Sequence, residues 1–227
     1  QSEYYIGLSS LRLNSPGFED NLLDFATNYP THPKTKKAFF HLGSYYFRKA
    51  DYQQAQKYLE KSGIDCIEDE EDIEALFKLA YSYFQQGDER QAARIFNQIK
   101  AGNHEYVGPA NYYAGYLNYE KGDYQTALSD LEQASLDPNL QEETNSLIPG
   151  IYYKLNRYQE VLDFVNKKES SGQVLPPELN LLAGECYFRI GQFDKAGQYF
   201  EKYLSGSDVP EDRVINYRIG YAYVRNQ

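Results

Sequence analysis

The sequence predicts an all-α fold in which antiparallel helix pairs stack side by side as an α-solenoid. The first observation is that three segments have similar sequences: KADYQQAQKYLEK at 49–61, KGDYQTALSDLEQ at 121–133 and IGQFDKAGQYFEK at 190–202. The second is a series of small residues spaced 34 to 37 positions apart, with Pro149 completing it: Gly43, Ala80, Gly115, Gly184 and Gly220. A period near 34 residues is typical of helix-turn-helix repeats.

The composition limits the classes of function. The 227-residue chain carries 33 acidic and 23 basic side chains, a net charge of −10. An acidic surface repels phosphate backbones, so nucleic acid is not an expected partner. No apolar run approaches the roughly 18 residues that cross a bilayer. Two cysteines, Cys66 and Cys186, lie far apart and predict isolated thiols rather than a disulfide framework.

Residues 1–34 are expected to form a degenerate helix pair. Tyr4–Leu13 and Phe18–Tyr29 have helical patterns, and the turn-forming sequence NSPG at 14–17 separates them. Gln1 is an unusual first residue that is compatible with removal of a secretion signal. No N-terminal cysteine is present, so no lipid anchor is predicted.

Residues 35–204 are predicted to form five complete helix pairs. Each small residue on a first helix is followed twelve positions later by a small residue on the second, which lets the helices approach closely; these are Ala55, Ala92, Ala127, Val161 and Ala196. Four positions further on, a large side chain fills the space beside the crossing: Leu59, Phe96, Leu131, Val165 and Phe200. In the turns, glycine tolerates a left-handed residue, and three aspartates are predicted to cap the second helices: Asp51, Asp88 and Asp123.

Residues 205–227 contain a partial sixth unit. The segment 213–227 has the pattern of a first helix without its second. Its apolar residues therefore lack a packing partner. We expect the natural chain to continue and this end to self-associate through Val214, Tyr217 and Tyr221.

Pro149 lies inside the expected first helix of the fourth pair. Proline removes a helical hydrogen bond and clashes with the preceding turn. The sequence therefore predicts a kinked or shortened helix here. Because Ser146 and Gly150 are small, it also predicts a gap in the aromatic lining.

This pattern resembles the tetratricopeptide repeat family. The resemblance rests on the small-x-x-Tyr of the first helix, the Gly-Asp-Tyr turn, and the alanine and large residue of the second helix. It implies a right-handed superhelix that binds other proteins and catalyses no reaction. Glu89 departs from the family at the turn, and the position that often carries tryptophan holds other residues: Phe39, Leu76, Asn111, Asn145 and Asn180.

Two stretches are similar to cell-envelope members of the family. The sequence at 28–52 is similar to Tol-Pal-associated coordinator proteins and outer-membrane assembly lipoproteins, in which a Tyr-Pro pair also separates repeats. The order of units, including PANYYAGYLNYEKGDYQTAL at 109–128, is similar to long repeat proteins of Bacteroidota envelopes. The resemblance implies a periplasmic or cell-envelope location, with the cytoplasm as the alternative.

Family geometry, carried over by position, places three columns of first-helix residues on the concave face. The first column is Phe40, Phe77, Tyr112, Ser146, Leu181 and Tyr217. The middle column is Ser44, Tyr81, Tyr116, Gly150, Glu185 and Tyr221. The third column is Phe47, Phe84, Tyr119, Tyr153, Phe188 and Val224.

From these columns we expect an aromatic surface that binds an extended peptide or a partner helix. Its residues are Phe40, Phe47, Phe77, Tyr81, Phe84, Tyr112, Tyr116, Tyr119, Tyr153, Phe188 and Tyr221. Packing between repeats competes with binding as the explanation of the first and third columns, and is favoured there. The middle column, with Tyr81 and Tyr116, is the better candidate for binding. Lys37 and Arg48 do not reproduce the clamp by which some family members hold a terminal carboxylate.

No catalytic residue, metal site or cofactor is predicted. The histidines His32, His41 and His104 have no metal-ligand spacing and are expected at the surface or in turns. The acidic run at 65–74 lacks the ligand spacing of a calcium loop. It is expected to begin a helix, where the helix dipole favours negative charge. A packing role is expected for Cys186.

Three functions are therefore compared. The first is a binding scaffold for a segment of an envelope protein. The second is a structural arc of a longer superhelix, whose aromatic residues mainly pack between repeats and whose C-terminal end mediates assembly. The third, an enzyme, would need a cluster of polar groups that the sequence does not contain.

Overall fold

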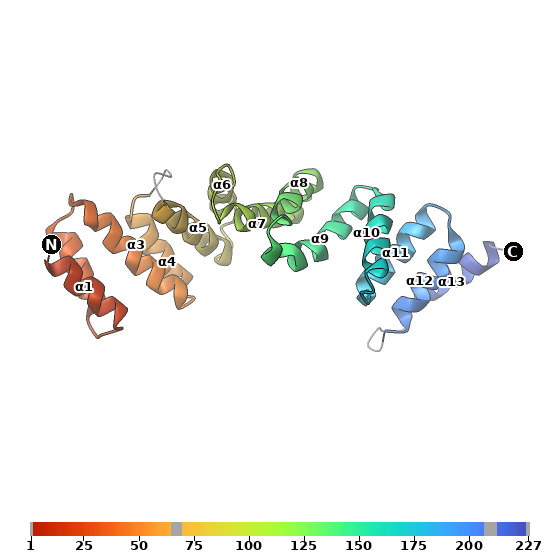
Figure 1. The fold of residues 1–227 in the computed structure, drawn as a ribbon, viewed down its shortest axis with the longest axis horizontal. Helices are drawn as coiled ribbons and strands as arrows, with labels where there is room; N and C mark the ends of the chain where they lie inside the picture. The colour runs from red at the N-terminus through yellow and green to blue at the C-terminus, as the bar shows by residue number, and fades with distance from the viewer. Residues whose placement is uncertain (1, 65–69, 207–212, 226–227) are drawn as a thin grey trace. The chain divides into compact units, whose positions relative to one another are not determined.

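The computed structural model describes residues 2–64, 70–206 and 213–225. Within these ranges every regular element is helical, which confirms the all-α prediction (Figure 1). The helices are α1 (Ser2–Arg12), α2 (Phe18–Asn28), α3 (Pro33–Arg48), α4 (Tyr52–Lys61), α5 (Glu70–Gln85), α6 (Glu89–Ile99), α7 (Val107–Glu120), α8 (Tyr124–Ala134), the 3-10 helix η1 (Pro138–Leu140), α9 (Gln141–Lys154), α10 (Tyr158–Ser170), α11 (Pro177–Arg189), α12 (Phe193–Leu204) and α13 (Arg213–Arg225).

The chain divides into two compact units, Gln1–Leu117 and Asn118–Gln227, here named the N-terminal and C-terminal units. In the N-terminal unit, α1 packs on α2, α3 on α4 and α5 on α6. In the C-terminal unit, α9 packs on α10 and α11 on α12. The helices thus follow one another as stacked pairs within each unit. That residues 1–227 form a single solenoid stays a prediction.

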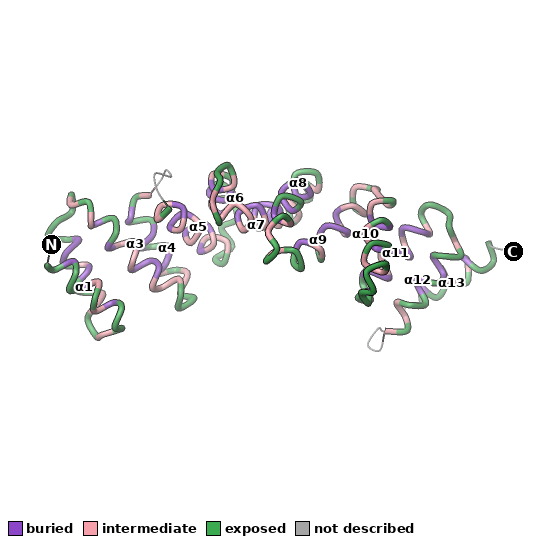
Figure 2. Tube along the Cα trace, in the orientation of Figure 1, coloured by how far each residue is buried: buried purple, intermediate pink, exposed green. Residues whose placement is uncertain are grey.

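Glycine permits close contact between the helices of a pair. A Cβ atom at Gly43 would lie 2.6 Å from Leu59 Cγ, and one at Gly184 would lie 2.5 Å from Phe200 Cδ1. Neither site has room for a larger side chain. The facing small residues are fully buried, as predicted: Ala55, Ala92, Ala127, Val161 and Ala196. Figure 2 shows buried and exposed segments alternating along the helices, as amphipathic packing requires.

The turns inside the pairs also follow the prediction. Asp51 accepts a hydrogen bond from the backbone N–H of Gln54 at 3.1 Å, and Asp88 and Asp123 cap α6 and α8 in the same way. The residue before the cap is left-handed, with φ of 79° at Gly87. The preceding turn reaches this conformation with Ala50 instead.

Tyrosine-to-glutamate hydrogen bonds connect successive pairs. Tyr83 donates to Glu60 at 2.5 Å and Tyr152 donates to Glu132 at 2.8 Å. Burial, followed by the hydrogen bond to the carboxylate, raises the pKa of each of these two tyrosines to about 12. The tyrosine three positions after the small residue therefore has a structural role.

The predicted shortening of the Pro149 helix is wrong. Helix α9 runs unbroken from Gln141 to Lys154 with buried Pro149 inside it. Ile148 and Ile151 are 7% and 0% exposed, so packing holds the helix on both sides of the missing hydrogen bond. Tertiary packing supplies most of the stability of a helix in a protein and here outweighs the local cost of proline.

The structure bears on the predictions made for the cysteines and for the acidic run at 65–74. Cys186 is fully buried, as its packing role requires, and burial raises the pKa of its thiol to about 12. Cys66 and residues 65–69 of the acidic run lie outside the described residues. Glu70 and Glu71 stand in the first turn of α5, as expected.

The histidines occupy three different environments. His32 caps α3 by accepting a hydrogen bond from the N–H of Lys34 at 3.1 Å. His41 is half-buried within α3, where its Nε2 lies 3.1 Å from the hydroxyl of Tyr4, and burial lowers its pKa. The ring nitrogens of His104 are buried and make no hydrogen bond within the described part of the chain.

Candidate functional site

A network of aromatic rings surrounds Tyr81 on the first helices of the N-terminal unit. The ring centroid of Tyr81 lies 5.4 Å from that of Phe47 on α3 and 5.3 Å from that of Tyr113 on α7. Burial, followed by the interaction with Tyr81, raises the pKa of both Tyr52 and Tyr113. Rings at these distances and tilts attract one another beyond the burial of their area.

Most of the predicted N-terminal residues join this network. The rings of Phe77 and Phe84 lie beside that of Tyr81. The ring centroid of Tyr116 is 5.8 Å from that of Phe84, and the ring centroid of Tyr112 is 5.2 Å from that of Tyr113. All these rings are half-buried, so each keeps part of its surface in contact with solvent. Phe40 differs, because it is 7% exposed and belongs to the core of the unit.

The third column makes a repeated contact inside the pairs, except on α5, where Phe84 has no aromatic partner at the start of α6 because that helix begins with Glu89. Its aromatic ring packs against the first aromatic residue of the following helix, with centroids 5.8 Å apart for Phe47 and Tyr52. Equivalent pairs in the C-terminal unit are Tyr119 with Tyr124, Tyr153 with Tyr158, and Phe188 with Phe193. Phe188 also contacts Tyr221 on α13 at 5.6 Å. These contacts explain the third column by packing within the pair.

Sequence reasoning missed the residue two positions before each small residue, here named the bridging position. Lys78 at this position on α5 donates to Ser44 Oγ at 2.9 Å, and Tyr113 on α7 packs on Tyr81. Arg218 on α13 forms an ion pair with Glu185. In each case the partner is the middle-column residue of the preceding pair. The repeat spacing could have identified this rule, because both positions recur with the small residue.

Lys78 brings positive charge into the aromatic surface. Its side chain is only 13% exposed and forms an ion pair with Glu74. Its ammonium lies 5.3 Å from the ring centroid of Phe40 and 6.0 Å from that of Phe47. Lys78 is on α5, whereas Ser44 and both rings are on α3, so these contacts help to position α5 on α3.

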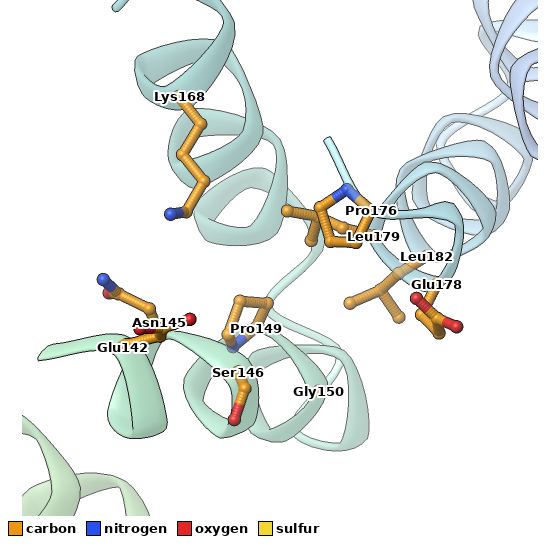
Figure 3. A pocket seen from close by; sticks show the side chains of 10 residues that line it. All are labelled: Glu142, Asn145, Ser146, Pro149, Gly150, Lys168, Pro176, Glu178, Leu179 and Leu182. Carbon is orange, nitrogen blue, oxygen red and sulfur yellow. The ribbon is translucent and has the colours of Figure 1, made fainter. Parts of the chain in front are cut away.

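The predicted gap beside Pro149 is a pocket of about 660 Å³ in the C-terminal unit, here named the α9 pocket (Figure 3). Helix α9 contributes small and polar residues to its lining, including Asn145, Ser146 and Gly150. Helix α11 contributes Leu179 and Leu182. A Cβ atom at Gly150 would meet no other atom within 4 Å. The bridging residue Leu182 therefore has no middle-column side chain to lie on.

Two further properties of the described residues bear on function. They contain no group of three or more His, Cys, Asp or Glu side chains arranged to hold a metal ion. None of the described helices is both long enough and apolar enough to cross a bilayer.

Comparisons with known proteins agree with this architecture. Models of the tetratricopeptide repeat match residues 36–62, 74–101 and 177–205. These segments coincide with the pairs α3–α4, α5–α6 and α11–α12. No curated protein matches the chain in sequence.

Solved structures share the fold at low identity. A crystal structure of MamA protein is 18% identical, covers 80% of this chain and 100% of that chain, and has a TM-score of 0.58. The C-terminal part of a TPR repeat-containing protein from Cytophaga hutchinsonii is 14% identical, covers 82% of this chain and 71% of that chain, and has a TM-score of 0.60. A tetratricopeptide repeat protein from Parabacteroides merdae is 15% identical, covers 98% of this chain and 100% of that chain, and has a TM-score of 0.51.

Likeness at this level of identity shows the fold alone, whereas the repeat models identify the repeats themselves. Such repeats generally mediate protein–protein interaction and are typically non-catalytic. The chain therefore carries tetratricopeptide repeats within an all-α fold of stacked helix pairs.

Proposed function

We propose that the chain is a non-catalytic scaffold whose first-helix aromatic surface binds a peptide segment or helix of a partner protein. The observation that carries this proposal is the half-buried ring network around Tyr81. Tyrosine offers a large contact area at low entropic cost together with a polar tip, which suits a surface that binds another protein. No cofactor is needed for this function.

Affinity capture from an extract of the source organism tests this surface. The wild-type chain is compared with Tyr81→Ala/Tyr116→Ala and with the control Tyr29→Ala/Tyr223→Ala, whose residues are 44% and 52% exposed and stand outside the ring network. Thermal unfolding checks that all three are folded, and Tyr116→Ala alone replaces the double variant if folding is lost. We expect a protein that the wild type and the control retain and the surface variant loses. Identical capture by all three would contradict the proposal.

We also propose a periplasmic or cell-envelope location. It is supported by the similarity of residues 28–52 and 109–128 to envelope repeat proteins. Fractionation of source cells, followed by immunodetection of the chain, tests this location. Recovery in the periplasmic or membrane fraction is expected, and recovery with cytoplasmic markers would contradict it.

The open face of α13 favours a second candidate function, assembly through the C-terminal end. Val214, Tyr217 and Val224 on α13 are 58%, 70% and 74% exposed. A Cβ atom at Gly220 would meet nothing within 4 Å, whereas Gly43 and Gly184 are covered by their second helices. Sedimentation velocity over a range of concentrations tests self-association. A monomer throughout, unchanged by Tyr217→Lys, would contradict this candidate.

A further inference from the structure

We propose that the α9 pocket binds one aromatic side chain of a partner segment, with a lysine or arginine of that segment beside it. This inference rests on the proposed function, because it assigns a specific subsite to the partner. It concerns only the C-terminal unit, so it can be tested apart from the ring network around Tyr81.

The same positions on α5 indicate what the pocket lacks. Leu76, Phe77 and Tyr81 on α5 correspond to Asn145, Ser146 and Gly150 on α9, counted from Ala80 and Pro149. On α5 two of these three side chains are aromatic rings, and the ring of Tyr81 meets the bridging residue Tyr113 at 5.3 Å.

On α9 both rings are absent, and the bridging residue Leu182 lines open space instead. The pocket of about 660 Å³ lies within the roughly 300–1,000 Å³ range of binding pockets. An aromatic side chain supplied by a partner would fill the space that the chain's own rings fill on α5.

The walls of the pocket are suited to a ring. Pro149 is buried on α9, and Leu179 on α11 is 8% exposed. Leu182 adds a half-buried aliphatic surface on the α11 side. A ring that enters this pocket would bury apolar area against three apolar side chains, which is favourable by about 25 cal/mol per Å².

Carboxylates at the pocket favour a basic neighbour for that ring. Figure 3 shows Glu142 on α9 and Glu178 on α11 on opposite sides of the pocket. Both are exposed, and neither forms an ion pair with another described residue. The pocket cation Lys168 already donates to Gln173 at 3.2 Å and lies 5.2 Å from the Phe164 ring centroid. The two carboxylates outnumber the single ammonium among the residues that line the pocket, so the charge of the lining is negative, as is the net charge of −10 on the chain.

The chain contains no tryptophan, so indole fluorescence can report binding of a short peptide directly. The probes are acetyl-Lys-Trp-Lys-amide and its counterpart acetyl-Glu-Trp-Glu-amide, each titrated with the full chain. Gly150→Phe blocks the pocket without overpacking, because the added side chain enters open space. Gly220→Phe is the matched control, since a Cβ atom there also meets nothing within 4 Å and the site lies on α13.

We expect saturable binding of the lysine probe to the wild type and to Gly220→Phe. Binding to Gly150→Phe should be about tenfold weaker or worse, since the ring loses its burial. The glutamate probe should bind several-fold more weakly than the lysine probe, and Glu142→Gln/Glu178→Gln should reduce that preference.

Three results would overturn the proposal: equal binding to Gly150→Phe and Gly220→Phe, no saturable binding by either probe, or tighter binding of the glutamate probe. Failure of affinity capture through Tyr81 and Tyr116 would leave this assay intact, because the two tests use different units. If capture fails while the lysine probe binds, the α9 pocket is a site and the ring network is not.

Discussion

Helices α5 and α9 are both the first helix of their repeat but carry different side chains in the first and middle columns. On α5 the first and middle columns hold Phe77 and Tyr81, and Tyr81 is at the centre of a ring network. On α9 the same columns hold Ser146 and Gly150, which line a pocket. Both helices are continuous, and each has a tyrosine bonded to a glutamate of the preceding pair.

The residues that pack the helix pairs together are shared between repeats, whereas the residues in the first and middle columns vary. The small residue recurs on the first helices, with proline replacing it on α9, and the Tyr–Glu bond recurs on α3, α5, α9 and α13. Column residues differ between pairs without interrupting the helices. Function in such repeats resides on the variable positions, because the shared ones are required for packing.

The largest expected effect follows from filling a glycine that is already in contact. Gly184→Leu should lower the free energy of unfolding by about 1–3 kcal/mol through overpacking against Phe200. Gly150→Leu enters open space and should cost nothing. Urea denaturation measures both variants, and an equal loss in the two would contradict the distinction between the filled and empty helices.

Removing the central ring of the filled helix should have the next largest effect. Tyr81→Ala loses contacts with several rings on α3, α5 and α7 and should cost about 2–3 kcal/mol. Tyr153→Ala on α9 loses one ring pair, with Tyr158, and should cost about 1 kcal/mol. If thermal unfolding gives the same loss for both, Tyr81 is not the packing centre of its unit.

Alkaline pH should weaken both helices through the bonds they share. The pKa values of Tyr83 and Tyr152 are raised to about 12 in the fold, from about 10 in an unfolded chain. Their stabilisation is therefore complete below about pH 10 and is lost as the pH rises through about 12. The free energy of unfolding, measured across this window, should fall less steeply in Tyr83→Phe. The raised pKa of the buried Cys186 thiol changes the free energy of unfolding in the same direction. Tyr83→Phe is therefore introduced into a chain that already carries Cys186→Ala. A slope that Tyr83→Phe leaves unchanged would exclude this tyrosine as a cause.

The smallest expected effect is a gain of stability. Gly150→Ala should stabilise the chain by about 0.5–1 kcal/mol, because alanine favours the helix and the site is empty. Gly43→Ala should destabilise it, since the added Cβ atom would lie 2.6 Å from Leu59 Cγ. A stabilising Gly43→Ala in thermal unfolding would indicate that α3 and α4 can move apart freely.

Features encoded within one repeat could be predicted from the sequence. The small residue, its facing alanine and the aspartate cap each depend on fixed local spacing, as Gly43, Ala55 and Asp51 illustrate. The gap at Ser146 and Gly150 was also predictable, because it results from missing side-chain volume at known positions.

The contacts made by the bridging positions between repeats were not predicted. Tyr113 contacts Tyr81, which lies 32 positions earlier, and Lys78 contacts Ser44, which lies 34 positions earlier. The sequence of a single helix does not indicate these contacts. The shortening expected at Pro149 failed for the same reason, since the burial of Ile148 and Ile151 comes from neighbouring helices.

Site-specific photo-crosslinking tests directly whether the ring network around Tyr81 binds a partner protein. A photoreactive phenylalanine is placed at Tyr116, at the edge of the ring network, and at exposed Tyr29 as the control. The scaffold account predicts a discrete crosslinked protein from position 116 in cells of the source organism, and none from position 29. The same products from both positions, or none from position 116, would contradict binding at this surface.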